Sequence, residues 1–248
     1  MLGAKPNTMM KNIALLCGRG GSVSVREKNL YPVLGRPMMM YPLLAAKAAR
    51  HVDAVYISTD SESMKALARA NGVSVIDRPA ELATATAQHV DTLIHALDHL
   101  RGEGIEVKYL VVVMCNCATY PSGLIDDCIE RLERDPRADS CVTGYIDNDH
   151  HPYRVKQMGE DGYLRTWMDL SHLQVSTNRQ DLPPCHILDH AMWILRVATC
   201  FPPRGQKPWT FMGERILFAN NEGSRDIHSM EDLEYTAKYL RLHGWSEA

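Results

Sequence analysis

A short apolar run, Ile13-Ala14-Leu15-Leu16, leads into a glycine-rich turn that begins at Gly18. Such a run is typical of a buried strand, and glycines at its exit remove the Cβ atoms that would keep a phosphate away from backbone N–H groups. Arg19 and Lys28 bring positive charge to the same loop. The pattern predicts an α/β domain whose first loop wraps a nucleotide triphosphate, with an ordinary strand–helix turn as the alternative.

Two common phosphate loops do not fit this turn. A Walker A loop needs Gly-x-x-x-x-Gly-Lys-Ser/Thr, and no such run occurs in the chain. The dinucleotide fingerprint Gly-x-Gly-x-x-Gly matches at Gly18 and Gly20, but its last position is Val23. If the loop holds phosphate, it does so in another way.

Length and composition narrow the class of protein. The 248 residues, 45% hydrophobic and 23% charged, suit one sizeable α/β domain. A net charge of −3 gives no electrostatic case for binding nucleic acid or a membrane surface. No apolar stretch approaches the ~20 residues that span a bilayer, and the first residues lack the apolar core of a signal peptide. Seven cysteines, mostly in apolar runs, indicate reduced thiols and a cytoplasmic protein.

Apolar runs alternate with helical patterns, which predicts a mostly parallel sheet covered by helices on both faces. We expect strands at residues 12–17, 54–58, 73–76, 108–115, 139–146 and 188–195, and helices at 41–50, 61–71, 87–101, 122–134 and 230–243. Ser61, Ser122 and Ser229 are predicted N-caps, and Gly72 is a predicted C-cap. Residues 147–183 are polar and rich in turn residues, so we expect an insertion there rather than another strand–helix unit.

Ordered motifs between about residues 12 and 240 resemble the signature of the acylneuraminate (CMP-sialic acid synthetase-like) cytidylyltransferases. They are Arg19-Gly20-Gly21-Ser22 with Lys28-Asn29, Leu34-Gly35-Arg36-Pro37-Met38, Ser58-Thr59-Asp60, Arg78-Pro79-Ala80-Glu81-Leu82-Ala83-Thr84, Arg179-Gln180-Asp181-Leu182-Pro183 and Ser224-Arg225-Asp226-Ile227. The resemblance implies a Rossmann-like nucleotidyltransferase fold in a single domain over residues 1–248. It also implies a homodimer in which an insertion at about 147–183 reaches into the partner subunit.

The resemblance further implies that CMP passes from CTP to an acidic sugar, a sialic acid or a related nonulosonate, with release of pyrophosphate. Mg²⁺ is the implied metal ion, since carboxylates and phosphate oxygens are its ligands. The implied catalytic residues are Arg19, Lys28 and Asp226. The implied nucleotide-binding residues are Gly18, Arg19, Gly20, Gly21, Ser22, Asn29, Arg78, Ala80 and Ala83.

Three positions depart from the family pattern on the nucleotide and metal side. Val23 stands where the family has Lys, with Arg26 nearby as a substitute charge or a solvated surface residue, and Ala85 stands where it has an acid. The family's Asp-x-Asp pair becomes Asp226 and His228. Imidazole is a poor ligand for Mg²⁺ and a better one for Zn²⁺, Mn²⁺ or Fe²⁺. Either one carboxylate suffices, or the preference has shifted toward a metal such as Mn²⁺, or catalysis is impaired.

Further departures cluster where the acceptor should bind. Arg179 and Gln180 resemble acceptor contacts, and an Arg is a sensible clamp for a sugar carboxylate. Asp189 and His190 replace an Asn-Gly pair, and Asn116 stands roughly where a polar acceptor contact is expected. We interpret these changes as a shift in acceptor identity.

Two alternatives stay open. One is cytidylyl transfer to another acid, such as a 3-deoxy-octulosonate or a phosphonate. The other is a nucleotide-binding homologue that no longer catalyses, which Val23, Ala85 and His228 favour. The retained loop, Arg78 and Asp226 favour an active enzyme.

Overall fold

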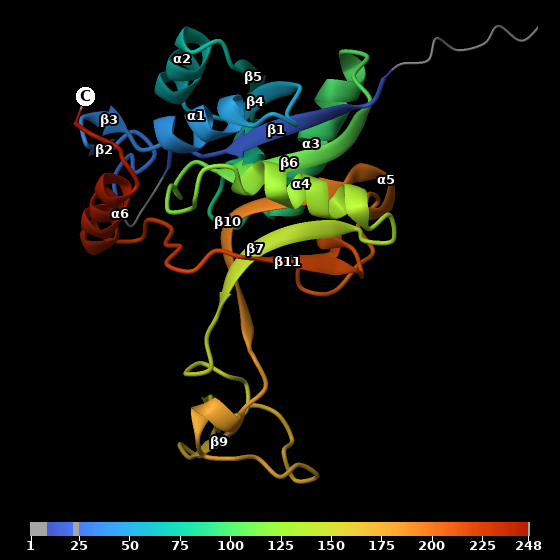
Figure 1. The fold of residues 1–248 in the computed structure, drawn as a ribbon, viewed down its shortest axis with the longest axis vertical. Coiled ribbons are helices and arrows are strands. Elements are labelled where there is room, and N and C mark those ends of the chain that lie inside the picture. Colours follow the sequence, from blue (N-terminus) through green and yellow to red (C-terminus); the bar gives the residue numbers. More distant parts are fainter. Residues whose placement is uncertain (1–8, 22–24, 248) are drawn as a thin grey trace, which may run out of the picture.

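In the part of the chain that the computed structural model describes, residues 9–21 and 25–247, a seven-stranded sheet of order β11-β7-β10-β6-β1-β4-β5 forms the centre (Figure 1). Its strands are β1 (Lys11–Cys17), β4 (Ala54–Thr59), β5 (Ser74–Asp77), β6 (Val107–Met114), β7 (Ser140–Ile146), β10 (His186–Arg196) and β11 (Ile216–Asn220). Neighbouring strands run parallel except that β10 is antiparallel to β6 and β7. The predicted mostly parallel sheet is confirmed.

Helices flank this sheet (Figure 1). They are α1 (Met40–Ala48), α2 (Glu62–Ala70), α3 (His89–Gly102), α4 (Leu124–Arg134), α5 (Val197–Cys200) and α6 (Met230–Leu242), with 3-10 turns η1 (Ala80–Leu82), η2 (Arg179–Asp181) and η3 (Thr210–Met212). Ile13 to Leu16 on β1 and Leu110 to Val113 on β6 are 0% exposed. Strands covered on both faces have no solvent side, which is why their sequences are continuous apolar runs.

The predicted helix starts are confirmed at two of three positions. The Ser61 hydroxyl accepts from the Met64 N–H at 3.4 Å. Ser229 forms a capping box with Asp232, each side chain accepting from the other residue's backbone N–H. The Ser122 prediction is wrong, because α4 begins after Gly123, whose φ of +84° is left-handed and whose position carries no side-chain cap. Gly72, with φ +69°, follows α2 in the conformation expected of a glycine that ends a helix.

Several short elements were not predicted: β2 (Pro32–Val33), β3 (Arg36–Pro37), β8 (Lys156–Met158), β9 (Leu164–Thr166) and the edge strand β11. These strands have two to five residues, too few to establish a period-2 pattern. None of the described helices has the length and apolar content that a bilayer crossing requires.

The segment between β7 and β10 projects away from the sheet and carries the β8–β9 hairpin and η2 (Figure 1). It begins after Ile146 and ends before His186, close to the predicted insertion at 147–183. Its hairpin strands are exposed along their whole length. A role for this insertion in dimerisation stays a prediction.

Candidate functional site

A cavity of about 540 Å³ opens at the carboxyl ends of β1 and β6. Ligands of open α/β sheets bind at this edge, because loops leaving parallel strands converge there. The cavity gathers predicted residues from distant parts of the chain: Gly18, Arg19, Lys28, Asn29, Arg78, Asn116, His190, Asp226 and His228. Gly20, Gly21, Ala80, Ala83, Arg179, Gln180 and Asp189 are not among its lining residues. Ser22 and Val23 lie outside the described residues.

The buried side chain of Asn29 lines this cavity and has only part of its hydrogen-bonding capacity satisfied by the described residues. Its side-chain N–H donates to the Arg19 carbonyl at 3.2 Å, and the residue is 5% exposed. Its Oδ1 is buried and accepts no hydrogen bond from the described residues. Buried polar atoms nearly always have a partner, so the donor to this oxygen lies outside the described residues.

Arg78 is held at the end of β4. Its Nε donates to the Ser58 hydroxyl at 3.1 Å, and its Nη2 donates to the Ser58 carbonyl at 2.7 Å. Arg19 makes only a long contact, 3.5 Å from Nη1 to the Ala83 carbonyl. Both guanidiniums face a polar cavity, which makes this end of the site positive.

The glycines of the turn play different parts. A Cβ on Gly18 would lie 2.6 Å from Met64 Cε and 2.9 Å from Cys115 Cβ, so close packing requires glycine there. The Gly20 N–H donates to Asp60 Oδ1 at 2.8 Å, so it does not face the cavity as a free phosphate donor. A Cβ on Gly21 would meet none of the described residues within 4 Å, and one on Gly20 would lie 3.1 Å from Ser61 Cβ. Gly18 therefore lines the cavity and has the closest contacts of these three glycines within the described residues.

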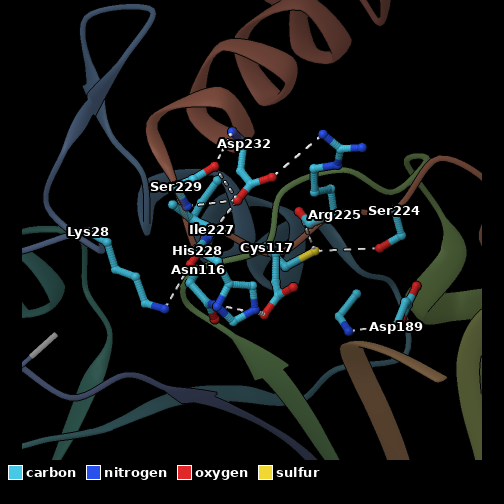
Figure 2. A network of polar contacts seen from close by, with 12 residues as sticks. Lys28, Asn116, Cys117, Asp189, Ser224, Arg225, Ile227, His228, Ser229 and Asp232 are labelled. Carbon is cyan, nitrogen blue, oxygen red and sulfur yellow. Dashed lines mark hydrogen bonds and ion pairs between the residues drawn. The ribbon is translucent and has the colours of Figure 1, made fainter. Parts of the chain in front are cut away.

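Lys28 brings a cation to the other side of the loop. Its Nζ donates to the Ile227 carbonyl at 2.8 Å, which ties the first loop to the segment before α6 (Figure 2). Burial lowers the pKa of Lys28, and the neighbouring Asp226 carboxylate acts in the opposite direction. Arg26 is exposed and is not among the lining residues, in keeping with the solvated alternative.

The side chains of Asp226 and His228 lie in contact, as expected for positions i and i+2 of an extended segment. His228 Nε2 lies 2.7 Å from Asp226 Oδ2, and Asn116 Nδ2 donates to the same oxygen at 3.4 Å. The described residues contain no group of three His, Cys, Asp or Glu side chains able to hold a metal ion. An ion here would therefore depend on Asp226 together with ligand oxygens.

His190 lines the far side of the cavity from an unusual backbone conformation. Its φ of +57° is left-handed, and it lies within the irregular part of β10 between Leu188 and Trp193. Its ring stands 5.0 Å from the Trp209 ring. Burial lowers the pKa of His190, partly opposed by Asp226 and Asp189.

Sequence reasoning missed the residues at the start of α3. Gln88, His89 and Thr92 line the cavity, and the His89 ring packs against Trp193 at 5.3 Å. Their signal was available, because they follow the Arg78–Thr84 motif directly and open the next helix. Helix N-termini favour anionic groups, so this is a plausible place for nucleotide contacts.

The remaining predicted acceptor residues lie elsewhere. The Asp189 carboxylate is buried and accepts from Thr143 Oγ1 at 2.5 Å, from the Ala191 N–H at 2.9 Å and from Asn221 Nδ2 at 2.6 Å. Arg179 on the insertion pairs with Asp149 at 2.6 Å, and Gln180 beside it is exposed. Within one subunit, neither η2 residue reaches the cavity, so their acceptor role stays a prediction that depends on a partner subunit.

Comparison with known proteins identifies relatives of this chain. N-acylneuraminate cytidylyltransferase of Streptococcus agalactiae serotype V is 26% identical over 241 residues, covering 93% of this chain and 54% of that protein. Its namesake from Escherichia coli O18:K1:H7 is 36% identical over 87 residues, covering 35% of this chain and 21% of that protein. The chain thus spans about half or less of the length of these relatives.

A solved structure titled CMP:2-keto-3-deoxy-manno-octonic acid synthetase complexed with CTP matches with a TM-score of 0.65 at 14% identity. The match covers 94% of this chain and 99% of that one. This likeness shows the nucleotidyltransferase fold. Residues 13–182, more than half of the chain, match the family model described as Cytidylyltransferase. This chain therefore belongs to the cytidylyltransferase family.

Proposed function

We propose that this chain transfers CMP from CTP to an acidic sugar, a sialic acid or a related nonulosonate, and releases pyrophosphate. The observation that carries the proposal is the cavity of about 540 Å³, which is lined together by Arg19, Asn29, Arg78 and Asp226. A triphosphate needs cations, a ribose offers hydroxyl donors to Asn29, and a pyrimidine edge offers acceptors to a guanidinium.

The chemistry follows from positioning and charge. An acceptor hydroxyl attacks the α-phosphorus of CTP, a new P–O bond forms, and the bond to pyrophosphate breaks. Lys28 and Arg19 line the cavity where the leaving pyrophosphate would gain charge, and preorganised cations stabilise such a transition state. Ile227, whose carbonyl accepts from Lys28, fixes the direction of that ammonium group.

Mg²⁺ fits this site through Asp226 and the phosphate oxygens of the nucleotide, because Mg²⁺ is commonly bound through one or two carboxylates plus substrate phosphates. It would supply charge neutralisation at the phosphates. His228 already contacts Asp226 at 2.7 Å, so Mn²⁺ is the ion to compare with Mg²⁺.

Pyrophosphate release from CTP, measured against a panel of acidic sugars with UTP and ATP as comparison nucleotides, tests the proposal. We expect turnover with CTP and at least one acid. CTP binding by calorimetry without turnover on any acid would instead support the non-catalytic alternative.

A second candidate acceptor is a 3-deoxy-octulosonate. It is favoured by the fold of the octonic acid synthetase and by the replacement of the expected Asn-Gly pair with Asp189 and His190. The same assay separates the two acids by their kcat/KM ratio.

We also propose a homodimer built through the insertion. Apolar side chains there are strongly exposed, with Met158 at 66%, Tyr163 at 71%, Leu164 at 65% and Trp167 at 62%. Large exposed apolar patches mark interaction sites. Light scattering should report twice the 27.9 kDa chain mass, and Leu164→Asp with Trp167→Asp should shift the protein toward monomer.

A further inference from the structure

A second cavity, of about 370 Å³, adjoins the first. Both cavities are lined by His190 and Asp226, so these two side chains stand at the boundary between them. A molecule in the second cavity would meet a nucleotide in the first beside the Asp226 carboxylate. That is the arrangement that transfer between two substrates requires.

Arg225 brings positive charge to the second cavity, which it lines together with Tyr145 and Tyr235. Its side chain is 49% exposed, so a ligand can reach it. Asp189 also lines this cavity, but its two carboxylate oxygens already accept hydrogen bonds from Thr143, Ala191 and Asn221. The buried carboxylate is therefore occupied by the fold, whereas the guanidinium is open to an anion.

The backbone of Arg225 is held through both its N–H and its carbonyl, and Figure 2 shows the Cys117 contact. Its N–H donates to Thr119 Oγ1 at 2.6 Å, and its carbonyl accepts from the same hydroxyl at 3.1 Å. The Cys117 thiol also donates to that carbonyl, with 3.6 Å between sulfur and oxygen. These contacts join the segment before α6 to the segment after β6, so the position of the arginine is set by the core.

The side chain of Arg225 is oriented but not saturated. Its guanidinium carbon lies 4.5 Å from the centre of the Tyr235 ring, and its Nη1 lies 3.6 Å from Asp232 Oδ1. The Tyr235 hydroxyl donates to the Gly223 carbonyl at 2.9 Å, which fixes the ring under the arginine. A guanidinium presents a planar fork of N–H donors, and one long ion pair leaves much of that fork for a ligand.

The contrast with Arg179 is informative. Arg179 is the arginine that the sequence motif offers as the carboxylate clamp, but it pairs with Asp149 on the projecting insertion. Arg225 lies in the motif Ser224-Arg225-Asp226-Ile227, in which the sequence analysis gives a role only to Asp226. In the fold it is nonetheless the arginine of this subunit that lines the cavity next to Asp226.

We propose that the second cavity holds the acceptor and that Arg225 binds its carboxylate, which makes Arg225 a specificity-determining residue for acids. This inference rests on the proposed cytidylyl transfer. A forked guanidinium–carboxylate pair is geometrically selective and is stronger than a neutral hydrogen bond. The stacking on Tyr235 keeps the fork oriented before the acid arrives, which reduces the ordering cost of binding.

The test compares acids with their uncharged esters. Pyrophosphate release from CTP is measured with N-acetylneuraminate, with 3-deoxy-manno-octulosonate and with the methyl ester of each. In the wild type we expect KM for the acid to be roughly 10- to 100-fold lower than for its ester, the range of a hydrogen bond to a charged group. Arg225→Gln should raise KM for the acid by that factor and leave KM for the ester unchanged.

Two further variants sharpen the result. Arg225→Lys keeps the charge without the fork and should recover part of the preference for the acid. Arg241→Gln is the matched control, because Arg241 lies on α6 and pairs only with Glu247 in the described residues. CTP affinity by calorimetry and thermal unfolding should be unchanged in all three, which shows that each variant is folded and that the nucleotide cavity is intact.

An unchanged acid KM in Arg225→Gln overturns the assignment, and so does an equal loss for acid and ester. It is also overturned if Arg179→Gln alone removes the acid–ester difference. If the wild type binds CTP but uses neither acid, the proposed function fails. The two acids and their esters are then titrated into the CTP-bound protein. Acid binding that requires Arg225 supports the clamp, and absence of acid binding overturns it.

Discussion

The nucleotide half of the site and its acceptor half share one sheet edge but are built differently. On the nucleotide side, Gly18 and Arg19 follow β1 directly, and Arg78 follows β5 directly, so regular strands place them. On the acceptor side, His190 sits in an irregular stretch of β10, and Arg225 is held by Thr119, 106 residues away. Regular strands therefore set the geometry of the first half, and contacts between distant segments set that of the second.

The largest effect is expected at Asp226, which lies at the boundary between the two cavities. Asp226→Asn keeps the shape of the side chain and removes its charge. If Asp226 serves the transfer and not the affinity for nucleotide, pyrophosphate release should fall by about 100- to 1,000-fold, as for loss of a preorganised electrostatic group. CTP affinity should change only a few-fold. Steady-state kinetics with Asp98→Asn as an exposed control measures this, and full activity in the variant would refute the assignment.

Arg78→Gln should weaken the binding of CTP and leave the binding of the acceptor unchanged. The guanidinium is held by Ser58 and lines the cavity, so its loss removes charge-assisted contacts to the nucleotide. We expect CTP affinity to fall roughly 10- to 100-fold, with KM for the acid unchanged at saturating CTP. Calorimetry with Arg101→Gln as an exposed control is the measurement. A selective change in acceptor KM would contradict the division between the halves.

Two glycine variants, Gly18→Ala and Gly21→Ala, test whether close packing explains the presence of glycine in this turn. Gly18→Ala places a Cβ 2.9 Å from Cys115 Cβ, which cannot move without the strand. We expect a loss of about 1–3 kcal/mol in the free energy of unfolding. Gly21→Ala meets none of the described residues within 4 Å and should be neutral or slightly stabilising. Denaturant unfolding compares them, and equal losses would show that the packing account of Gly18 is wrong.

The smallest expected effect is on the pH dependence of stability, through His190 in the acceptor half. Burial lowers the pKa of His190 in the folded protein below the ordinary histidine value of about 6.5. The unfolded chain therefore binds more protons below that pH, and stability falls as the solution becomes more acidic. His190→Asn, which tolerates the left-handed backbone, should reduce the drop in Tm between pH values near neutral and near 5. An identical pH slope in the variant would exclude this contribution. His89 shifts in the same direction and remains in both proteins.

The fold was largely predictable from the sequence. Expected strands and helices agree with the structure to within one or two residues at most ends, because long apolar runs and amphipathic repeats carry a strong periodic signal. Short elements such as β11 and the two hairpins escaped, since a few residues cannot display a period. The antiparallel direction of β10 was also invisible, because direction depends on how the chain returns after the insertion.

The site was predictable in part. The motif residues Arg19, Lys28, Asn29 and Asp226 do come together around one cavity. Asp189 lines the adjoining cavity instead, and its carboxylate is already bonded to neighbours in the core. His89 was overlooked although it follows a recognised motif, and Arg225 was overlooked because only Asp226 was given a role in its motif.

The sequence alone determined which segments form buried strands, where the glycine turn lies and to which family the chain belongs. These properties depend on local periodicity and on motifs along the chain. Only the tertiary structure decided which polar side chains face a cavity and which already make their hydrogen bonds within the protein. Whether a buried carboxylate such as Asp189 is free or bonded depends on partners from its own strand and from two other segments. Hydrogen bonds and ion pairs act over a few ångströms in space, and no spacing along the chain reports that distance.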